Sequence, residues 1–386
     1  MRKLKYILLA FSSLIIINTS HAQWISDATG KKSAVKLANK AIDCMANLEY
    51  GRAQGFALAA LEIDSRTTTA KIVMSWTSGN DLSEEMNKEI MNMDMTETER
   101  LWMTIIKSPG NIHAGMAKAS GNKQPIITYI AAYESYESLD QWAKANPEIA
   151  GPAINSLAYA DFMGQGPRMI SPPDGINHER AEQRFKDYIK LTDSPNADDS
   201  YAEYLASQGD YAAALANQSN AFQKLYFVSP YYRKLELYWR KANKEQMESA
   251  LIERVEAFYN DLERLDSKVD DMIAKDVTIT EGMSSMESWI SSDYDTTIER
   301  YAQTSANMNW IERKAYDIRV DFGPNNDMGI VTFYMKGKYS TTTNPEVMDY
   351  HTRASEVWVL QGNNWYLMHS NFAPYEGGSG VPTVSN

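Results

Sequence analysis

The spacing of apolar residues changes once along this chain, and that change constrains the fold more than any single motif. From Ser33 to roughly Lys244, apolar and small residues recur every three or four positions, which is typical of amphipathic helices. Beyond Met308 they alternate with polar residues, as in half-buried strands. With 386 residues, the chain is long enough for two domains. We therefore expect a multidomain protein, in which an all-α helical-repeat array precedes an α+β domain with a curved antiparallel sheet.

The helical region contains pairs of apolar stripes joined by short turns. One turn is expected at Glu49-Tyr50-Gly51, the clearest pair starts at Asp199, and a further pair is expected at about 152–160 and 179–191. Small residues and one tyrosine recur at fixed places in these pairs: Ala41, Ala53, Ala60, Ala202, Gly209, Tyr211, Ala214 and Ala221. The pattern resembles the tetratricopeptide repeat, whose stacked helix pairs form a groove for a peptide or protein partner.

The array is expected to be degenerate. Residues Met163–Asn177 contain three glycines and three prolines, which exclude a long helix and predict an insertion on one face of the array. From Leu82 to Gln124 the composition is helical but the repeat register is poor. We expect about three to four helix pairs.

The last third of the chain combines helices and strands. Apolar spacing predicts one long helix over Glu248–Lys275, a short strand over Asp276–Gly282 and a second helix over about Ser285–Met308. Alternation then predicts strands at Tyr316–Phe322, Gly329–Tyr339, Met348–Leu360 and Trp365–Phe372. Gln361–Asn364 has the glycine and asparagines of a hairpin turn between the last two.

The closing hairpin carries a specific pattern. It reads Arg353-x-Ser355-x-Val357-Trp358, then Gly362, then Trp365-x-Leu367-x-His369-x-Asn371. Over about residues 248–376 the chain thereby resembles the SnoaL-like family of the nuclear transport factor 2-like superfamily. Asn371 stands where many relatives have histidine, and Ala373 where they often have serine. The resemblance implies a cone-shaped fold, a pocket between the curved sheet and its helices, and frequently a homodimer across the sheet.

Strict alternation predicts which residues face that pocket. On the last strand Trp365, Leu367, His369 and Asn371 share a face, and on the strand before it His351, Arg353 and Ser355 share one. If the hairpin closes as the resemblance implies, these strands and the second helix form a ligand pocket lined by Trp289, Tyr294, Tyr301, His351, Arg353, His369 and Asn371.

Two hypotheses remain open for this domain. In the first it is not catalytic, and it takes a small apolar ligand or forms a dimer, while its histidine and arginine satisfy one another. In the second the chain is an isomerase, dehydratase or hydrolase with His369 as general base, and Arg353 holds a carboxylate or an oxyanion. No acid falls convincingly on the same face of the hairpin, although Asp349 or Glu281 is expected nearby. The enzyme hypothesis requires His369 and a second titratable group to reach one point in an open cavity.

Charge and cysteine content exclude several classes of function. The net charge of −12, from 38 basic and 50 acidic residues, argues against nucleic acid or an anionic membrane surface as the main partner. The single cysteine, Cys44, excludes an intramolecular disulfide and a cysteine-cluster metal site. The five histidines are too scattered for a polyhistidine centre. We therefore expect no metal and no cofactor.

The amino-terminal segment is typical of a secretory signal peptide. Basic residues at positions 2, 3 and 5 precede an apolar run over Tyr6–Ile17, and Ser20-His21-Ala22 fits a signal-peptidase site. We expect cleavage after Ala22, a periplasmic or secreted protein, and no membrane span after cleavage; the alternative is a retained anchor, for which the run is short. The expected organisation is a signal peptide (1–22), the helical array (23–247), the SnoaL-like domain (248–376) and a flexible tail (377–386). The leading functional hypothesis is an exported binding or scaffold protein.

Overall fold

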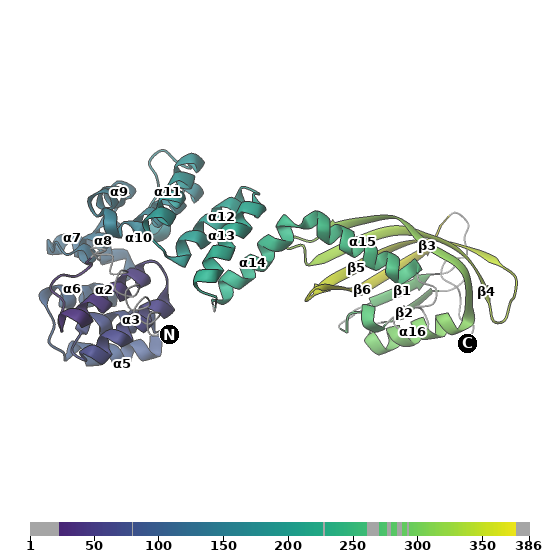
Figure 1. Ribbon diagram of the computed structural model, residues 1–386, viewed down its shortest axis with the longest axis horizontal. Coiled ribbons are helices and arrows are strands. Elements are labelled where there is room, and N and C mark those ends of the chain that lie inside the picture. Colours follow the sequence, from purple (N-terminus) through teal and green to yellow (C-terminus); the bar gives the residue numbers. More distant parts are fainter. Residues whose placement is uncertain are drawn as a thin grey trace, which may run out of the picture. The chain divides into compact units, whose positions relative to one another are not determined.

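The protein is described by a computed structural model over residues 23–78, 80–226, 228–260, 270–275, 279–283, 288–291 and 293–375. By their internal contacts the residues form two compact units, Met1–Tyr232 and Arg233–Asn386. Residues 233–247, which the sequence assigned to the array, are therefore part of the second unit. The first unit is helical and the second contains a six-stranded sheet (Figure 1), as the alternation of the sequence predicted.

The first unit is built from short helices joined by turns. Helices α2 and α3, α10 and α11, and α12 and α13 are successive packed pairs, and all three pairs lie where the sequence predicted them. The helices are α2 (Lys32–Ala46), α3 (Tyr50–Ile63), α4 (Thr68–Thr77), α5 (Asn80–Met91), α6 (Glu97–Lys107), α7 (His113–Ser120), α8 (Pro125–Ala132), α9 (Tyr136–Ala145), α10 (Gly151–Met163), α11 (His178–Leu191), α12 (Pro195–Ser207) and α13 (Tyr211–Lys224). Helix α14 (Ser229–Ala242) contains the boundary between the units.

Small side chains explain the close packing of these pairs. Ala41, Ala53 and Ala60 in the first pair are fully buried, as are Ala202 and Ala214 in the last. A methyl group at the contact lets two helix backbones approach more closely than a leucine would. The positions that suggested a tetratricopeptide-like unit are thus the contact positions between paired helices.

The predicted insertion links α10 to α11 without an α-helix. Its only regular element is a 3-10 turn at Pro167–Met169. Ile170 is buried, and the amide of Asn177 donates to the carbonyl of Asp161 at 2.8 Å. Gly166 lies so close to the Ser156 carbonyl that a Cβ there would stand 2.7 Å from it. The segment therefore packs closely on α10.

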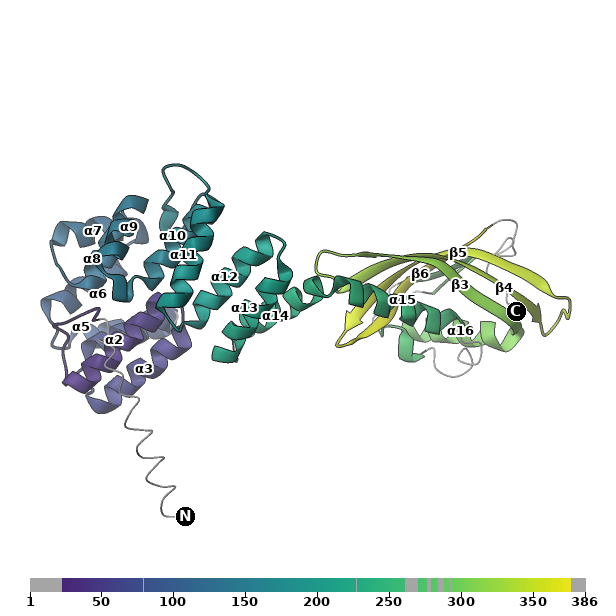
Figure 2. The same cartoon turned by 45° about the horizontal axis from the view of Figure 1, so that its top comes forward.

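The second unit places helices against one face of a curved sheet (Figure 2). Its elements are α15 (Lys244–Asn260), a 3-10 turn (Asp270–Met272), β1 (Ile279–Met283), β2 (Ser288–Ser291), α16 (Tyr294–Asn307), β3 (Met308–Phe322), β4 (Met328–Thr341), β5 (Met348–Gln361) and β6 (Asn364–Pro374). The strand order is β2-β1-β6-β5-β4-β3. Neighbouring strands are antiparallel except β1 and β6, which are parallel.

Two expectations for this unit were wrong. The predicted long helix does not run to Lys275, because Asp270–Met272 is a 3-10 turn and Ile273 pairs with Leu367 of the sheet. Trp289 lies in β2, opposite Gly282 of β1, and not in a helix. Trp289 and Ile290 belong to residue types that favour strands, and that local preference is decisive where the apolar spacing fits either structure. The helix that follows is correspondingly shorter, and β3 begins directly after it.

The core of this unit lies between α15 and one face of the sheet, which we call the inner face. Leu251, Val255 and Phe258 of α15 join a buried cluster with inner-face residues Phe333, Ala354, Trp358, Leu367 and Phe372. Burial alternates along β4 and β5, so that Thr332, Arg353 and Ser355 point to the opposite side. We call that side the outer face.

Candidate functional site

A β-bulge in the closing hairpin decides where the predicted site residues lie. Val357 of β5 pairs with His369, whereas the next residue, Trp358, pairs with Leu367. Met368 is therefore an extra residue in β6, and the alternation changes phase there. Trp365 and Leu367 are buried on the inner face, whereas His369 and Asn371 are only partly buried and share the outer face with their β5 partners.

The prediction that all four β6 residues share one face was therefore wrong, but the polar set does come together. His369 pairs with Val357, Asn371 pairs with Ser355, and Arg353 and His351 occupy the same face of β5. The four residues thus lie on one surface of the sheet. It is the outer face, on the other side of the sheet from α15, and not the interior pocket that the resemblance implied.

The three aromatic residues predicted for the pocket do not join them. Tyr294, in the first turn of α16, packs against the apolar cluster of the inner face. Trp289 and Tyr301 lie in β2 and α16 by their backbone, but their side chains fall outside the described residues. The sheet therefore separates Tyr294 from the polar residues of the outer face.

A hollow of about 410 Å³ opens on the outer face. One row of paired residues crosses it from strand to strand, namely Arg319, Thr332, Ser355 and Asn371. Arg353 and Tyr334, paired in the next row, complete its wall together with Asp317. Asp317 occupies a bulge in β3 with a φ of 50°, and its carboxylate forms an ion pair with Arg319 at 3.1 Å.

A column of tyrosines borders this hollow. Tyr334 stacks on Tyr316 with ring centroids 5.7 Å apart and lies 4.8 Å from the ring of Tyr375. The ammonium of Lys336 lies 5.5 Å above the Tyr316 ring, within the range of a cation–π contact. The outer face is thus a polar surface with an aromatic border, on which basic side chains are prominent.

The inner face holds a titratable residue that the sequence interpretation missed. Glu356 of β5 is 1% exposed, and its carboxylate accepts hydrogen bonds from the Tyr259 hydroxyl of α15 and, at 2.7 Å, from Trp358 Nε1. Burial raises the pKa of this carboxyl to about 7, against the effect of both donors. Ser370, its partner across the strands, has a buried hydroxyl without a hydrogen bond among the described residues.

A signal for Glu356 was present in the sequence. It occupies the same alternating set as Ala354 and Trp358, and this set forms the apolar face of β5. The search for an acid beside His369 passed over it because Glu356 has the opposite parity to Arg353. The structure accordingly separates Glu356, on the inner face, from His369, on the outer face. Asp349, one of the two acids expected near His369, has the parity of Arg353 and lies on the outer face of β5.

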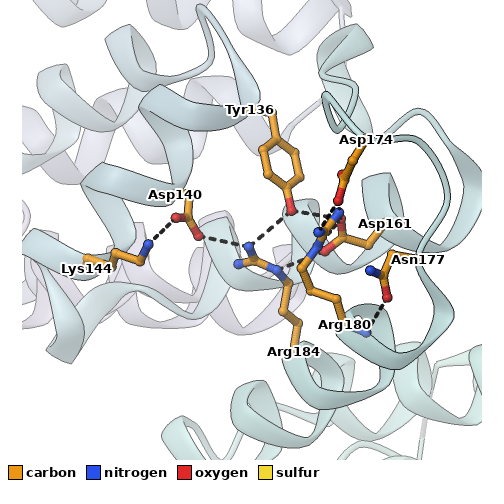
Figure 3. A network of polar contacts seen from close by, with 8 residues as sticks. All are labelled: Tyr136, Asp140, Lys144, Asp161, Asp174, Asn177, Arg180 and Arg184. Carbon is orange, nitrogen blue, oxygen red and sulfur yellow. Dashed lines mark hydrogen bonds and ion pairs between the residues drawn. The ribbon is translucent and has the colours of Figure 1, made fainter.

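A second polar cluster lies in the helical unit, at the root of the insertion (Figure 3). The carboxylate of Asp161, which is fully buried, accepts hydrogen bonds from Tyr136 Oη at 2.7 Å, Arg180 Nε at 2.9 Å and Arg184 Nε at 2.9 Å. Arg184 also pairs with Asp140 at 2.8 Å. Burial, and to a smaller extent the hydrogen bond to Asp161, raises the pKa of the Tyr136 hydroxyl to about 12. Every group is matched by a partner, so the cluster ties α9, α10 and α11 together.

No group of three or more His, Cys, Asp or Glu side chains that could hold a metal ion occurs among the residues with described positions. Within the part of the chain that the structure describes, no helix has both the length and the apolar character needed to cross a membrane.

Comparison with known proteins gives similarity at the level of solved structures. No protein-family model and no curated protein matches the sequence. A tetratricopeptide repeat protein from Thermus thermophilus matches with 15% identity over 53% of this chain and 98% of its own, with a TM-score of 0.27. A nuclear transport factor 2-like superfamily protein from Salmonella enterica serovar Typhimurium matches with 14% identity over 36% of this chain and 99% of its own, with a TM-score of 0.28. A phenazine biosynthesis-related protein from Pseudomonas aeruginosa matches with 13% identity over 38% of this chain and 97% of its own, with a TM-score of 0.25.

Proposed function

We propose that the chain is an exported binding protein, whose helical unit takes a helix of a partner protein on the outward face of α3. Export is supported by the basic and apolar segments that precede Ser20-His21-Ala22. Trp24 and Ile25 follow that tripeptide closely, and both are fully buried in the core of the helical unit. The folded array therefore already includes residues next to the expected cleavage site.

The outward face of α3 is the observation on which this proposal rests. Apart from the hydroxyl of Tyr50, the polar side chains of this 14-residue helix are Arg52, Gln54 and Glu62. Apolar residues nevertheless occupy its exposed side, where Leu58 is 52% exposed and Ile63 is 40% exposed. A cluster of exposed apolar side chains on one helix is a common mark of a protein-binding surface.

The shape of this face favours a helix as the occupant. Gly51, Gly55 and Ala59 are exposed and follow one another at intervals of four residues, so they lie on one side of α3. A Cβ placed on Gly51 or Gly55 would meet no atom within 4 Å. Such a row of small residues leaves the backbone of α3 accessible, so that the side-chain ridge of a second helix can pack closely against it. Leu58 would then cover the side of that contact.

The alternative, an enzyme with His369 as general base, has weaker support. A base and an acid must both reach the reacting atoms of one substrate. His369 lies on the outer face of the sheet, whereas Glu356 lies on the inner face. The two groups therefore cannot act on the same atom of a bound molecule. An enzyme of this kind would have to use Asp349, which lies on the outer face of β5, and the binding hypothesis requires no such pair.

Photo-crosslinking in an exporting host tests the surface directly. A crosslinking amino acid at position 58 should capture a specific protein, whereas the same group at the exposed position 179 of α11 should not capture it. The purified partner should then bind the full chain, and Leu58→Glu should weaken its Kd about tenfold or more. Because Leu58 is exposed, the melting temperature should not change.

Glu179→Gln, at the exposed position of α11 used for the crosslinking control, is the matched control and should keep the affinity of the original chain. The proposal is wrong if the captured partner binds Leu58→Glu as tightly as the original chain, or if position 179 captures it equally. Export is tested separately: the mass of the protein recovered outside the cytoplasm should correspond to a chain that begins at Gln23.

A further inference from the structure

We propose that the hollow on the outer face of the sheet is a binding site for a small hydroxylated carboxylate. The site lies in the second unit and does not depend on the partner proposed for α3. Three properties of the hollow carry the inference: a guanidinium with no counter-ion among the described residues, a row of hydroxyl and amide groups beside it, and a net charge that suits one negative group.

The guanidinium is that of Arg353. This residue is exposed on β5, and its guanidinium forms no hydrogen bond or ion pair with any residue whose position is described. Its neighbour on the adjacent strand is Tyr334, with which it is paired in register. Tyrosine provides no negative charge at neutral pH. A planar guanidinium in such a place presents two parallel N–H donors, which fit the two oxygens of a carboxylate.

Uncharged polar groups line the floor next to Arg353. Thr332 pairs with Ser355, and Ser355 pairs with Asn371, so these three side chains stand in one row across three adjacent strands. Adjacent strands are about 4.8 Å apart, so a small ligand with several hydroxyl groups can contact more than one of these side chains at once. The hydroxyls of Thr332 and Ser355 have no partner among the described residues. They can donate to, and accept from, the hydroxyl groups of a ligand.

The charge of the hollow selects a monoanion. Arg319 lies at the far end of the same row, but its charge is compensated by Asp317 at 3.1 Å. Arg353 therefore supplies the net positive charge, about one unit. A carboxylate with one negative charge is matched by it, whereas the second charge of a phosphate dianion would meet Asp317. The volume of about 410 Å³ lies within the range of small-molecule sites.

Titration calorimetry of the full chain with D-glucuronate at low ionic strength tests the site, with glucose as the uncharged analogue. We expect saturable binding of one glucuronate per chain and none of glucose. Arg353→Gln should weaken glucuronate binding about tenfold or more, since it removes both donors to the carboxylate. Lys338→Gln, at an exposed position of the same face of β4, removes the same charge outside the hollow and should change affinity less than about twofold.

Asp317→Asn distinguishes the proposed charge selection from general attraction. It should strengthen the binding of glucuronate and should allow inorganic phosphate to bind, which the original chain should reject. The inference is overturned if no saturable binding occurs up to about 50 mM glucuronate, or if Lys338→Gln weakens binding as much as Arg353→Gln. It is equally overturned if the chain is a dimer that dissociates in Arg353→Gln and takes up no glucuronate, because the face would then be an interface between two copies.

Discussion

The buried carboxyl of Glu356 should make the second unit less stable as the pH rises through neutrality. The residue is 1% exposed, and its two hydrogen-bond donors, Tyr259 and Trp358, carry no positive charge. Burial therefore penalises the ionised form, and the pKa rises from its ordinary value of 4.5 to about 7. In the unfolded chain the carboxyl is in water and keeps its ordinary pKa.

The sign and the size of the effect follow from this difference. Below about pH 4.5 the carboxyl is protonated in both states, and the folded unit has the full stability that this group allows. Between about pH 4.5 and 7 the native state still holds the proton that the unfolded chain has released, so the free energy of unfolding falls as the pH rises. A rise of the pKa from 4.5 to about 7 corresponds to a total loss of about 3 kcal/mol, which is complete near pH 8.

Glu356→Gln isolates this contribution. Glutamine has nearly the same shape but cannot ionise, and its amide can donate to Tyr259 Oη while its carbonyl oxygen accepts from Trp358. Urea unfolding of the full chain and of the variant, measured at about pH 5 and pH 8, gives the difference in the free energy of unfolding at each pH. Because the unfolded chain has already released most of this proton at about pH 5, we expect the variant to gain roughly 2.5 kcal/mol relative to the original chain between these two values.

Glu346→Gln is the control, because Glu346 is exposed in the segment between β4 and β5 and should show almost no such change. If the difference between the original chain and Glu356→Gln is the same at both pH values, Glu356 does not change its charge in this range. The argument that burial prevails over its two hydrogen bonds would then be wrong.

Three further substitutions test other parts of the structure. Asp161→Asn leaves two partly buried arginines without their shared, fully buried counter-ion and should lower the stability of the helical unit by about 3 kcal/mol, measured by chemical denaturation; a change below about 1 kcal/mol would mean that the cluster is not a structural tie. Trp24→Ala removes a fully buried side chain and should cost about 3–5 kcal/mol in the same assay, so an unchanged transition would refute the role given to the amino-terminal segment. Gly337→Ala would press a methyl group against the backbone carbonyl of Glu312 and should lower the melting temperature of the sheet unit, at a cost of about 1–3 kcal/mol; an unchanged melting temperature would show that the strands yield at that contact.

The helix pairs could be predicted from sequence because their determinants are local. Ala41, Ala53 and Ala60 mark helix contacts within about 20 residues of chain, and a period of 3.6 identifies their common side. The closing turn is likewise a local feature, and Gly362 there has the positive φ of 62° that favours glycine. The pairing of Ile273 with Leu367 depends instead on a strand distant in sequence, so local spacing could not show where the predicted long helix ends. Trp289, by contrast, pairs with the nearby strand β1.

Of the seven residues predicted to line one pocket, the four polar ones share a surface, whereas Tyr294 packs on the other face of the sheet. His351, Arg353, His369 and Asn371 do share a surface. Alternation alone assigned that surface to the interior, because it assumes that each residue of one strand faces one residue of the next. No sequence signal marks Met368 as the extra residue, since a methionine fits a regular strand and a bulge equally well.

That extra residue has a consequence for how such a protein changes over time. If β6 were straightened with Met368 in place, His369 and Asn371 would turn inward, and Ser370 and Phe372 would turn outward. A codon gained or lost between Leu367 and His369 could therefore exchange a solvent-facing polar pair for an enclosed one, while both side chains stayed the same. Two descendants of one ancestor could keep an identical histidine and use it on opposite faces of the same sheet.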